Sequence, residues 1–236
     1  MAGKQVSEVV TTLEESFKKT KEFCDTRGLL INASKTQFII LRAPGKRIEN
    51  DVEIHVMDHS IQHIRTVKLL GVTIDRGLTF GPHISTIVEK CNSTLGMLAK
   101  AAPFLPTKLL KIAYMSLVRT NLEYASAVYA SAANTHLKKL DVVQKIASRI
   151  ISHAPSRAHS APLIDALGLD SLQLRRNKHI VQIVNNCLSG NCHPALEEMF
   201  EADTVPNRVL MSNTGRIQMG KRKFSNFAAD IYNSHT

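Results

Sequence analysis

The chain changes its periodicity at residues 68–77, which have the sequence KLLGVTIDRG. Before this segment, short apolar or β-branched runs at Thr36–Leu41, Ile54–Val56 and Ile61–Ile64 are separated by turn-forming residues, a pattern typical of strands and hairpins. After Gly77 the apolar residues recur every three or four positions, which indicates amphipathic helices. The sequence therefore predicts an α+β fold, with a small antiparallel sheet first and a helical bundle after it.

Helical spacing also precedes the sheet, over Val6–Cys24, and Gly28 stands where a left-handed residue would end that helix. The later helices are expected from Pro82 to near Pro103, over 109–125 after Pro106, over 137–151 with Asn134 or Thr135 as cap, and over 162–167 and 171–188. From Thr204 onward the apolar period fades and basic residues prevail, so we expect a flexible basic tail. The predicted segments are a helix and partial sheet at 1–78, a helical domain at 79–201 and the tail at 202–236.

The composition favours a globular, cationic protein. The chain has 236 residues, 44% of them apolar, and its 30 Lys and Arg exceed its 20 Asp and Glu. This excess favours polyanionic partners. The four scattered cysteines predict no disulfide framework. There is no secretory signal, no uncharged apolar run of membrane-spanning length and no glycine at position 2 for myristoylation. We therefore expect a cytoplasmic or nuclear protein with no membrane partner.

Six short segments follow one another between residues 28 and 176. They are Gly28–Ile40 (GLLINASKTQFII), Lys68–Asp75 (KLLGVTID), Leu78–Ile84 (LTFGPHI), Leu122–Tyr129 (LEYASAVY), Ile146–Ile151 (IASRII) and Leu167–Leu172 (LGLDSL), the last followed by Arg175 and Arg176. In this order they resemble the reverse transcriptases of non-LTR (LINE or jockey-type) retrotransposons. Each segment alone is weak evidence for the resemblance, but six segments in the family's order are specific evidence for it. Leu69 and Tyr129 depart from the family, which often has an aromatic residue and Trp there; both changes conserve packing.

The resemblance implies a palm strand at the first segment, a primer grip at the second and the opening of the thumb at the third. Polymerases of this family hold two metal ions on palm carboxylates, which include an aromatic-x-Asp-Asp hairpin upstream of the first segment. No Asp-Asp pair occurs in this chain, and upstream of Gly28 there is one helix with a lone Asp25. We therefore expect a C-terminal fragment without catalytic residues that is inactive alone and holds no cofactor, Mg²⁺ being expected only in a full-length polymerase.

Basic residues on helices with apolar opposite faces could line a groove that follows a nucleic-acid backbone, although a solvated helix face explains most of them. The candidate nucleic-acid-binding residues are Lys35, Lys68, Gly71, Lys90, Lys100, Lys108, Lys111 and Arg149. By resemblance, Lys35 matches a lysine near the departing pyrophosphate, and Gly71 lets the backbone approach the primer strand. A turn lysine and a strand bend are the structural alternatives. We expect non-specific, salt-dependent binding of RNA, DNA or an RNA/DNA hybrid, and few aromatics argue against base stacking.

Other chemistry receives little support from the sequence. Cys187, Cys192 and His193 form a C-x4-C-H cluster that could supply three metal ligands, but no fourth ligand stands at zinc-finger spacing. No metal is therefore expected. No G-x-S-x-G motif for a nucleophilic serine is present.

Two alternative functions remain open. In one, the chain is the tail of a longer, active polymerase, which an upstream reading frame with aromatic-x-Asp-Asp would identify. In the other, it is a host-adopted helical module that binds RNA or a protein and has no polymerase role. Salt-sensitive nucleic-acid binding separates an RNA-binding module from a plain protein-interaction module.

Overall fold

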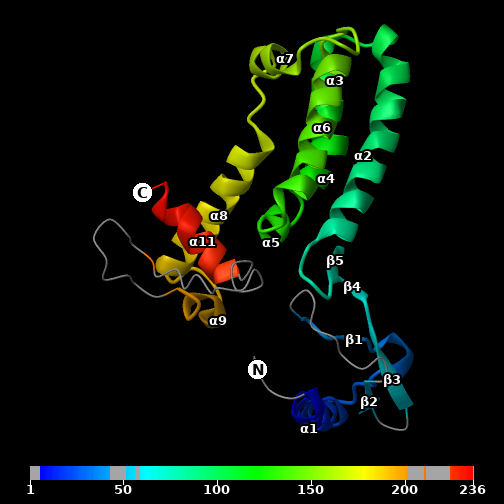
Figure 1. Ribbon diagram of the computed structural model, residues 1–236, viewed down its shortest axis with the longest axis vertical. Helices are drawn as coiled ribbons and strands as arrows, with labels where there is room; N and C mark the ends of the chain where they lie inside the picture. The colour runs from blue at the N-terminus through cyan, green and yellow to red at the C-terminus, as the bar shows by residue number, and fades with distance from the viewer. Residues whose placement is uncertain (1–5, 43–51, 57–58, 201–209, 211–223, 236) are drawn as a thin grey trace. The chain divides into compact units, whose positions relative to one another are not determined.

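The computed structural model describes residues 6–42, 52–56, 59–200, 210 and 224–235 (Figure 1). Contacts divide the chain into two units, Met1–Gly77 and Leu78–Thr236. In the described part of the chain, the first unit contains one long helix and the strands β1 to β5, and the second is helical. The α+β class predicted from the periodicity is therefore confirmed.

The N-terminal unit begins with a helix that ends at a left-handed glycine. Helix α1 spans Val6–Asp25, and Gly28 follows it with φ of 66°. The amide of Leu29 donates to the carbonyl oxygen of Cys24 at 2.9 Å, which closes the last turn. The remaining elements are η1 (Ala33–Lys35), β1 (Phe38–Ile39), β2 (Glu53–Val56), β3 (His59–Ile64), β4 (Thr66–Leu69) and β5 (Val72–Asp75).

Strands β1, β3 and β2 form a mixed sheet in that order. Strand β2 is antiparallel to β3, but β1 pairs with β3 in parallel, with Phe38 opposite His63. The prediction of a purely antiparallel sheet is therefore wrong for β1. The reason is topological: the long connection from β1 to β3 contains β2, so the chain can re-enter beside β1 in the same direction. Phe38, Ile54 and Val56 are the buried core of this sheet, and Val10 and Phe17 of α1 pack against it.

The segment around Gly71, for which a strand bend was the structural alternative, is a hairpin. Leu69 pairs with Val72, so only Leu70 and Gly71 lie in the turn. Their φ angles are 46° and 84°. Two-residue hairpin turns of the type I′ class require positive φ at both positions, which glycine adopts freely. Gly71 is therefore a turn residue, and the expectation of a bend or bulge inside a strand is corrected.

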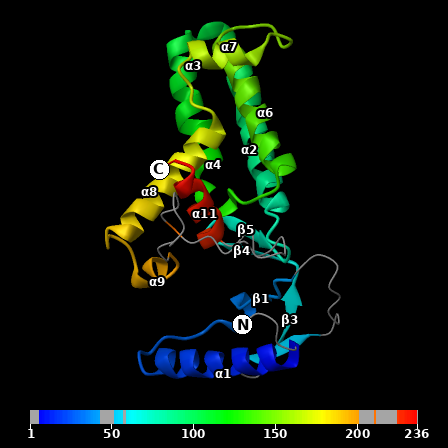
Figure 2. The ribbon, with the colours of Figure 1, turned by 60° about the vertical axis from the view of Figure 1, so that its left-hand side comes forward.

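The C-terminal unit is a set of helices in which α2 and α6 lie side by side along most of their length (Figures 1 and 2). Its elements are α2 (Gly81–Ala101), η2 (Ala102–Phe104), α3 (Thr107–Tyr114), the π-helical segment η3 (Met115–Arg119), α4 (Thr120–Glu123), α5 (Ser126–Tyr129), α6 (Asn134–Ile151), α7 (Ser160–Ala166), α8 (Leu172–Leu188), α9 (Pro194–Glu197) and α11 (Phe224–Asn233). Fully buried side chains include Ile84, Leu110, Tyr114, Leu140 and Ile151.

Two details of the predicted helices are corrected. The helix expected over 109–125 is divided by the π-helical turn η3 and by Ala125, whose φ is 52°. The hydroxyl of buried Tyr129 donates to the carbonyl oxygen of Leu122, which satisfies a group freed at this break. In addition, neither Asn134 nor Thr135 caps α6, because the helix begins at Asn134 itself and has no side-chain cap.

The tail expected to be flexible contains a packed helix. Helix α11 lies against α8 (Figure 2), and Ala228 and Ala229 are fully buried there with Ile180 and Val184. The side chain of Asn233 accepts from the amide of Leu210 at 3.0 Å and donates to its carbonyl oxygen at 2.9 Å. The small side chains of α11 permit this close approach to α8. Because alanines give only a weak apolar periodicity, the sequence did not indicate a helix here. The prediction is therefore wrong for 224–233, while 202–209 and 211–223 lie outside the described residues.

Among the residues that the structure describes, no helix has both the length and the apolar character needed to cross a lipid bilayer.

Candidate nucleic-acid interface

Three candidate residues belong to the N-terminal unit. Lys35 is exposed at the end of η1, where its amide donates to Oδ1 of Asn32 at 3.2 Å. Lys68 is exposed on β4, two residues before the hairpin turn that contains Gly71. The structure therefore places Lys68 and Gly71 at one end of the β4–β5 hairpin, and Lys35 on a different turn. Leu70, which lies between Lys68 and Gly71 at the tip of the hairpin, is 84% exposed.

The candidates in the C-terminal unit fall into two groups. Lys90 and Lys100 on α2 and Lys108 on α3 are exposed, and none forms an ion pair with a described residue. Lys111 Nζ instead donates to the carbonyl oxygen of Leu167 at 2.6 Å. Arg149 Nε donates to the carbonyl oxygen of Ala158 at 2.8 Å. Each of these last two cations therefore holds a connecting segment against a helix.

Helix α6 adds further exposed cations, Lys138, Lys139 and Lys145, to those on α2 and α3. These side chains are also without an ion pair among the described residues. Unpaired ammonium groups on a helix surface are well hydrated and remain available to a polyanion. The helical unit therefore presents lysines from α2, α3 and α6 to solvent.

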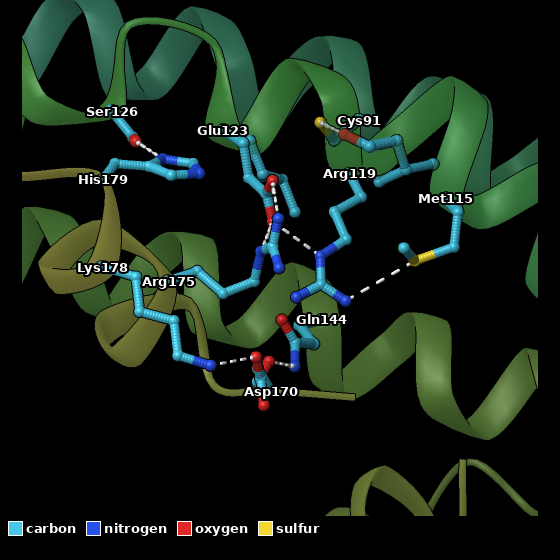
Figure 3. Close-up of polar contacts among 12 residues, drawn as sticks. Cys91, Met115, Arg119, Glu123, Ser126, Gln144, Asp170, Arg175, Lys178 and His179 are labelled. Carbon is cyan, nitrogen blue, oxygen red and sulfur yellow. Dashed lines mark hydrogen bonds and ion pairs between the residues drawn. The ribbon is translucent and has the colours of Figure 1, made fainter. Parts of the chain in front are cut away.

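A polar network links α4 to α8 (Figure 3). The carboxylate of Glu123 accepts from Nε of Arg119 at 2.7 Å and from Nη2 of Arg175 at 2.8 Å, and Oε1 also accepts from Nε of Arg175. Beside it, Lys178 pairs with Asp170 at 3.0 Å, and Gln144 of α6 donates to the backbone of Asp170 at 3.0 Å. The network thus connects three helices and the segment before α8.

The charges of this network shift the acidity of its members. Burial disfavours the carboxylate of Glu123, but the hydrogen bonds from Arg175 and Arg119 outweigh burial and hold its pKa below the ordinary value. The same hydrogen bond raises the pKa of Arg175. Burial raises the pKa of neighbouring Tyr114 to about 12. All three groups therefore keep one protonation state near neutral pH.

Several buried polar atoms around the network have no hydrogen-bond partner among the described residues. They include Nη2 of Arg119, Nε and Nη1 of Arg176, and Oε1 of Gln144. Arg119 is 4% exposed and Arg176 is 3% exposed. In the described part of the chain, the one carboxylate hydrogen-bonded to either of these guanidinium groups is that of Glu123, which binds Arg119, so the loss of Glu123 would leave the buried charge of Arg119 without its partner.

The sequence did not indicate this network, although it contained its parts. Glu123 belongs to the fourth motif and Arg175 follows the sixth, and the structure brings the two together across 52 residues. The spacing of Arg119 and Glu123, four residues apart on a helical pattern, was the available signal. The structure also joins Ser126 Oγ to His179 Nδ1 at 3.0 Å.

Cys187, Cys192 and His193 were the candidate metal ligands of the sequence. No group of three His, Cys, Asp or Glu side chains in the described part of the chain is placed to hold a metal ion. Burial, with a hydrogen bond to Cys192, raises the pKa of Cys187 to about 11, so this thiol is protonated near neutral pH.

Comparison with known proteins identifies relatives of one kind. Over 162 residues, 64% of this chain, it is 30% identical to "RNA-directed DNA polymerase from mobile element jockey" of Drosophila funebris, and it covers 16% of that protein. The jockey polymerase of Drosophila melanogaster is 26% identical over 158 residues, 65% of this chain and 17% of the relative. The "Probable RNA-directed DNA polymerase from transposon BS" of Drosophila melanogaster is 24% identical over 181 residues, 73% of this chain and 19% of the relative.

The chain spans less than a fifth of the length of these relatives, 16% to 19%. No family model matches it, and no solved structure does. The resemblance carried by the six motifs is nevertheless confirmed, since the curated proteins similar to this chain are RNA-directed DNA polymerases of non-LTR retrotransposons and support its being a fragment of one.

Proposed function

We propose that this chain is part of a retrotransposon RNA-directed DNA polymerase that binds nucleic acid through exposed lysines and does not itself transfer nucleotides. The observation that carries the proposal is the similarity to the jockey polymerase over 162 residues. The exposed, unpaired lysines of α2, α3 and α6 supply the chemistry for phosphate contacts. The β4–β5 hairpin, with Lys68 and Gly71, is the segment that resembles the primer grip.

Binding of this kind is electrostatic and non-specific. Each lysine that neutralises a phosphate releases condensed counterions, so affinity falls with the logarithm of the salt concentration. Lysine side chains have no planar group on which bases could stack, so the base sequence contributes little. The partner is an RNA/DNA hybrid, RNA or DNA, since all three have a phosphate backbone.

Fluorescence anisotropy with a labelled RNA/DNA hybrid tests the binding. The triple variant Lys90→Gln, Lys100→Gln, Lys108→Gln should bind more weakly, and its log–log salt slope should be smaller by roughly 2 to 3. Lys178→Gln is the matched control, because Lys178 is also exposed but is paired with Asp170. Affinity that does not depend on salt, or a triple variant indistinguishable from Lys178→Gln, would contradict the proposal and favour a plain protein-interaction module.

Primer extension tests the absence of catalysis. Nucleotide transfer by such polymerases needs two metal ions held by carboxylates, and the sequence contains no Asp-Asp pair. The purified chain with a primed RNA template, deoxynucleotides and Mg²⁺ should therefore extend no primer. Template-dependent extension above that of a heat-inactivated sample would refute this part of the proposal.

A further inference from the structure

The outer surface of α3 and η3 carries a stripe of which the proposed function uses only Lys108. A shallow hollow of about 570 Å³ is lined by Lys108, Lys111, Ile112, Met115 and Ser116. These positions have the spacing i, i+3, i+4, i+7 and i+8, which places them on one face of a helix. The opposite face of the same helix is the one that packs inward, where Leu110, Tyr114 and Val118 are fully buried.

The stripe, hereafter the α3 face, is apolar at its centre. Ile112 is 55% exposed and Met115 is 38% exposed, and Leu109, one turn before Ile112, is 48% exposed. These are large side chains on consecutive turns. Contiguous exposed apolar surface of this kind, bordered by polar groups, is characteristic of interaction sites. The π-helical segment η3 begins at Met115, and such segments are frequent at functional sites.

The charge of the α3 face is of one sign. Residues 107–116 contain Lys108 and Lys111 but no aspartate or glutamate. Lys108 is exposed, and Lys111 is held at the edge by its bond to the Leu167 carbonyl oxygen. A partner that covers Ile112 and Met115 must therefore place its own border against ammonium groups. Acidic residues on that border would complement them.

We propose that the α3 face docks an acidic amphipathic helix of a partner protein. The partner's aliphatic residues would cover Ile112 and Met115, and its carboxylates would face Lys108 and Lys111. The stripe from Lys108 to Ser116 extends over about 12 Å, which matches about two turns of a partner helix. Helix-in-groove recognition of this kind uses anchors at i, i+3, i+4 and i+7.

Two other occupants fit the α3 face less well. A second copy of the chain would bring the same lysines together, and each copy has a formal charge of +10. A nucleic-acid backbone would place phosphates against Ile112, Met115 and Leu109, which can neither stack on bases nor hydrogen-bond to phosphate. Both occupants are distinguishable outcomes of the experiment.

The test uses the full chain and a fluorescein-labelled synthetic helix of about 20 residues, a length that can form a stable helix, with a leucine stripe flanked by glutamates. A twin peptide carries lysine in place of each glutamate. We expect the glutamate peptide to bind and the lysine peptide not to bind. Ile112→Asp should weaken binding roughly tenfold or more. Val142→Asp on α6 is the matched control, because Val142 is 50% exposed, also β-branched and mid-helix, and not among the residues of the hollow.

Lys108→Glu provides an independent measurement, since it reverses the charge without touching the apolar residues. This variant should bind the glutamate peptide more weakly and the lysine peptide more tightly than the wild-type chain does. Circular dichroism of each variant verifies that the helices are intact. The proposal is overturned if the glutamate peptide does not bind, or if it binds Ile112→Asp as tightly as Val142→Asp. The proposal is also overturned if the chain self-associates in sedimentation velocity, or binds the RNA/DNA hybrid, and Ile112→Asp abolishes that association or binding. Either result would assign the α3 face to another occupant.

Discussion

Replacing Glu123 with glutamine removes the one charge that holds Arg119 and Arg175 together. Glutamine has nearly the same shape, so packing between α4 and α8 is kept while the carboxylate is lost. Arg119 is only 4% exposed and one of its nitrogens already has no partner among the described residues. The variant therefore leaves a buried guanidinium without a counter-charge, which is the costly way to break an ion pair.

The magnitude follows from how deeply the network is buried. Removing one partner of a fully buried pair costs about 3–5 kcal/mol. The side chains of Glu123 and Arg175 remain 18% and 31% exposed, so water partly screens and rehydrates them. We therefore expect Glu123→Gln to lower the free energy of unfolding by about 2–3 kcal/mol, a large part of the roughly 5–15 kcal/mol typical of a domain.

Urea unfolding followed by circular dichroism at the helical band measures this change. The control is Lys178→Gln, because the Lys178–Asp170 pair is 57% and 40% exposed, and exposed pairs contribute about 0–1 kcal/mol. A double-mutant cycle with Arg175→Ala isolates the coupling between the two side chains. If Glu123→Gln is no more destabilising than Lys178→Gln, the network does not stabilise the fold and the reasoning is refuted.

The destabilisation caused by Glu123→Gln should depend on pH. The pKa of Glu123 is lower in the folded chain than its ordinary value of 4.5. Its contribution is therefore complete above that value and is lost as the pH falls through the folded-state pKa. The stability difference between the wild-type chain and Glu123→Gln should accordingly shrink on acidification below about pH 4.5. A difference that stays constant over this range would contradict the assignment.

Three further changes test other parts of the fold. Burial lowers the pKa of His83 below 6.5, so the unfolded chain binds more protons and stability should fall as the pH drops below that value; His83→Gln should show a flatter dependence in urea titrations, and an equal slope would count against the role of His83. Leu70→Asn should raise the free energy of unfolding of the N-terminal unit by about 0.5–1 kcal/mol, because asparagine tolerates positive φ better than leucine. The melting temperature should rise accordingly, and a lower one would contradict the turn assignment. Ala229→Leu should destabilise the packing of α11 on α8 by about 1–3 kcal/mol, seen as faster amide exchange in α11, whereas unchanged exchange would mean that α11 does not pack there.

The order and type of most elements could be predicted from local patterns of residues. The switch from strands to helices beyond Gly77 and the course of α2, α6 and α8 were predicted from apolar spacing, because that spacing reports which residues of one segment share a face. The left-handed stop at Gly28 was also predicted, since a cap depends on residues within one turn. The six motifs indicated the polymerase relatives for the same reason, as each is a short local pattern.

Contacts between residues far apart in the sequence became known only from the three-dimensional fold. The parallel pairing of β1 with β3 depends on the path of the connection, and the bond between Glu123 and Arg175 joins residues 52 positions apart. Likewise, whether a basic residue faces solvent, as Lys108 does, or holds a carbonyl oxygen, as Lys111 does, depends on what the fold places beside it. Periodicity assigns a residue to a face of its own helix, but the partner of that face is set by contacts between elements, and these are absent from any local stretch of sequence.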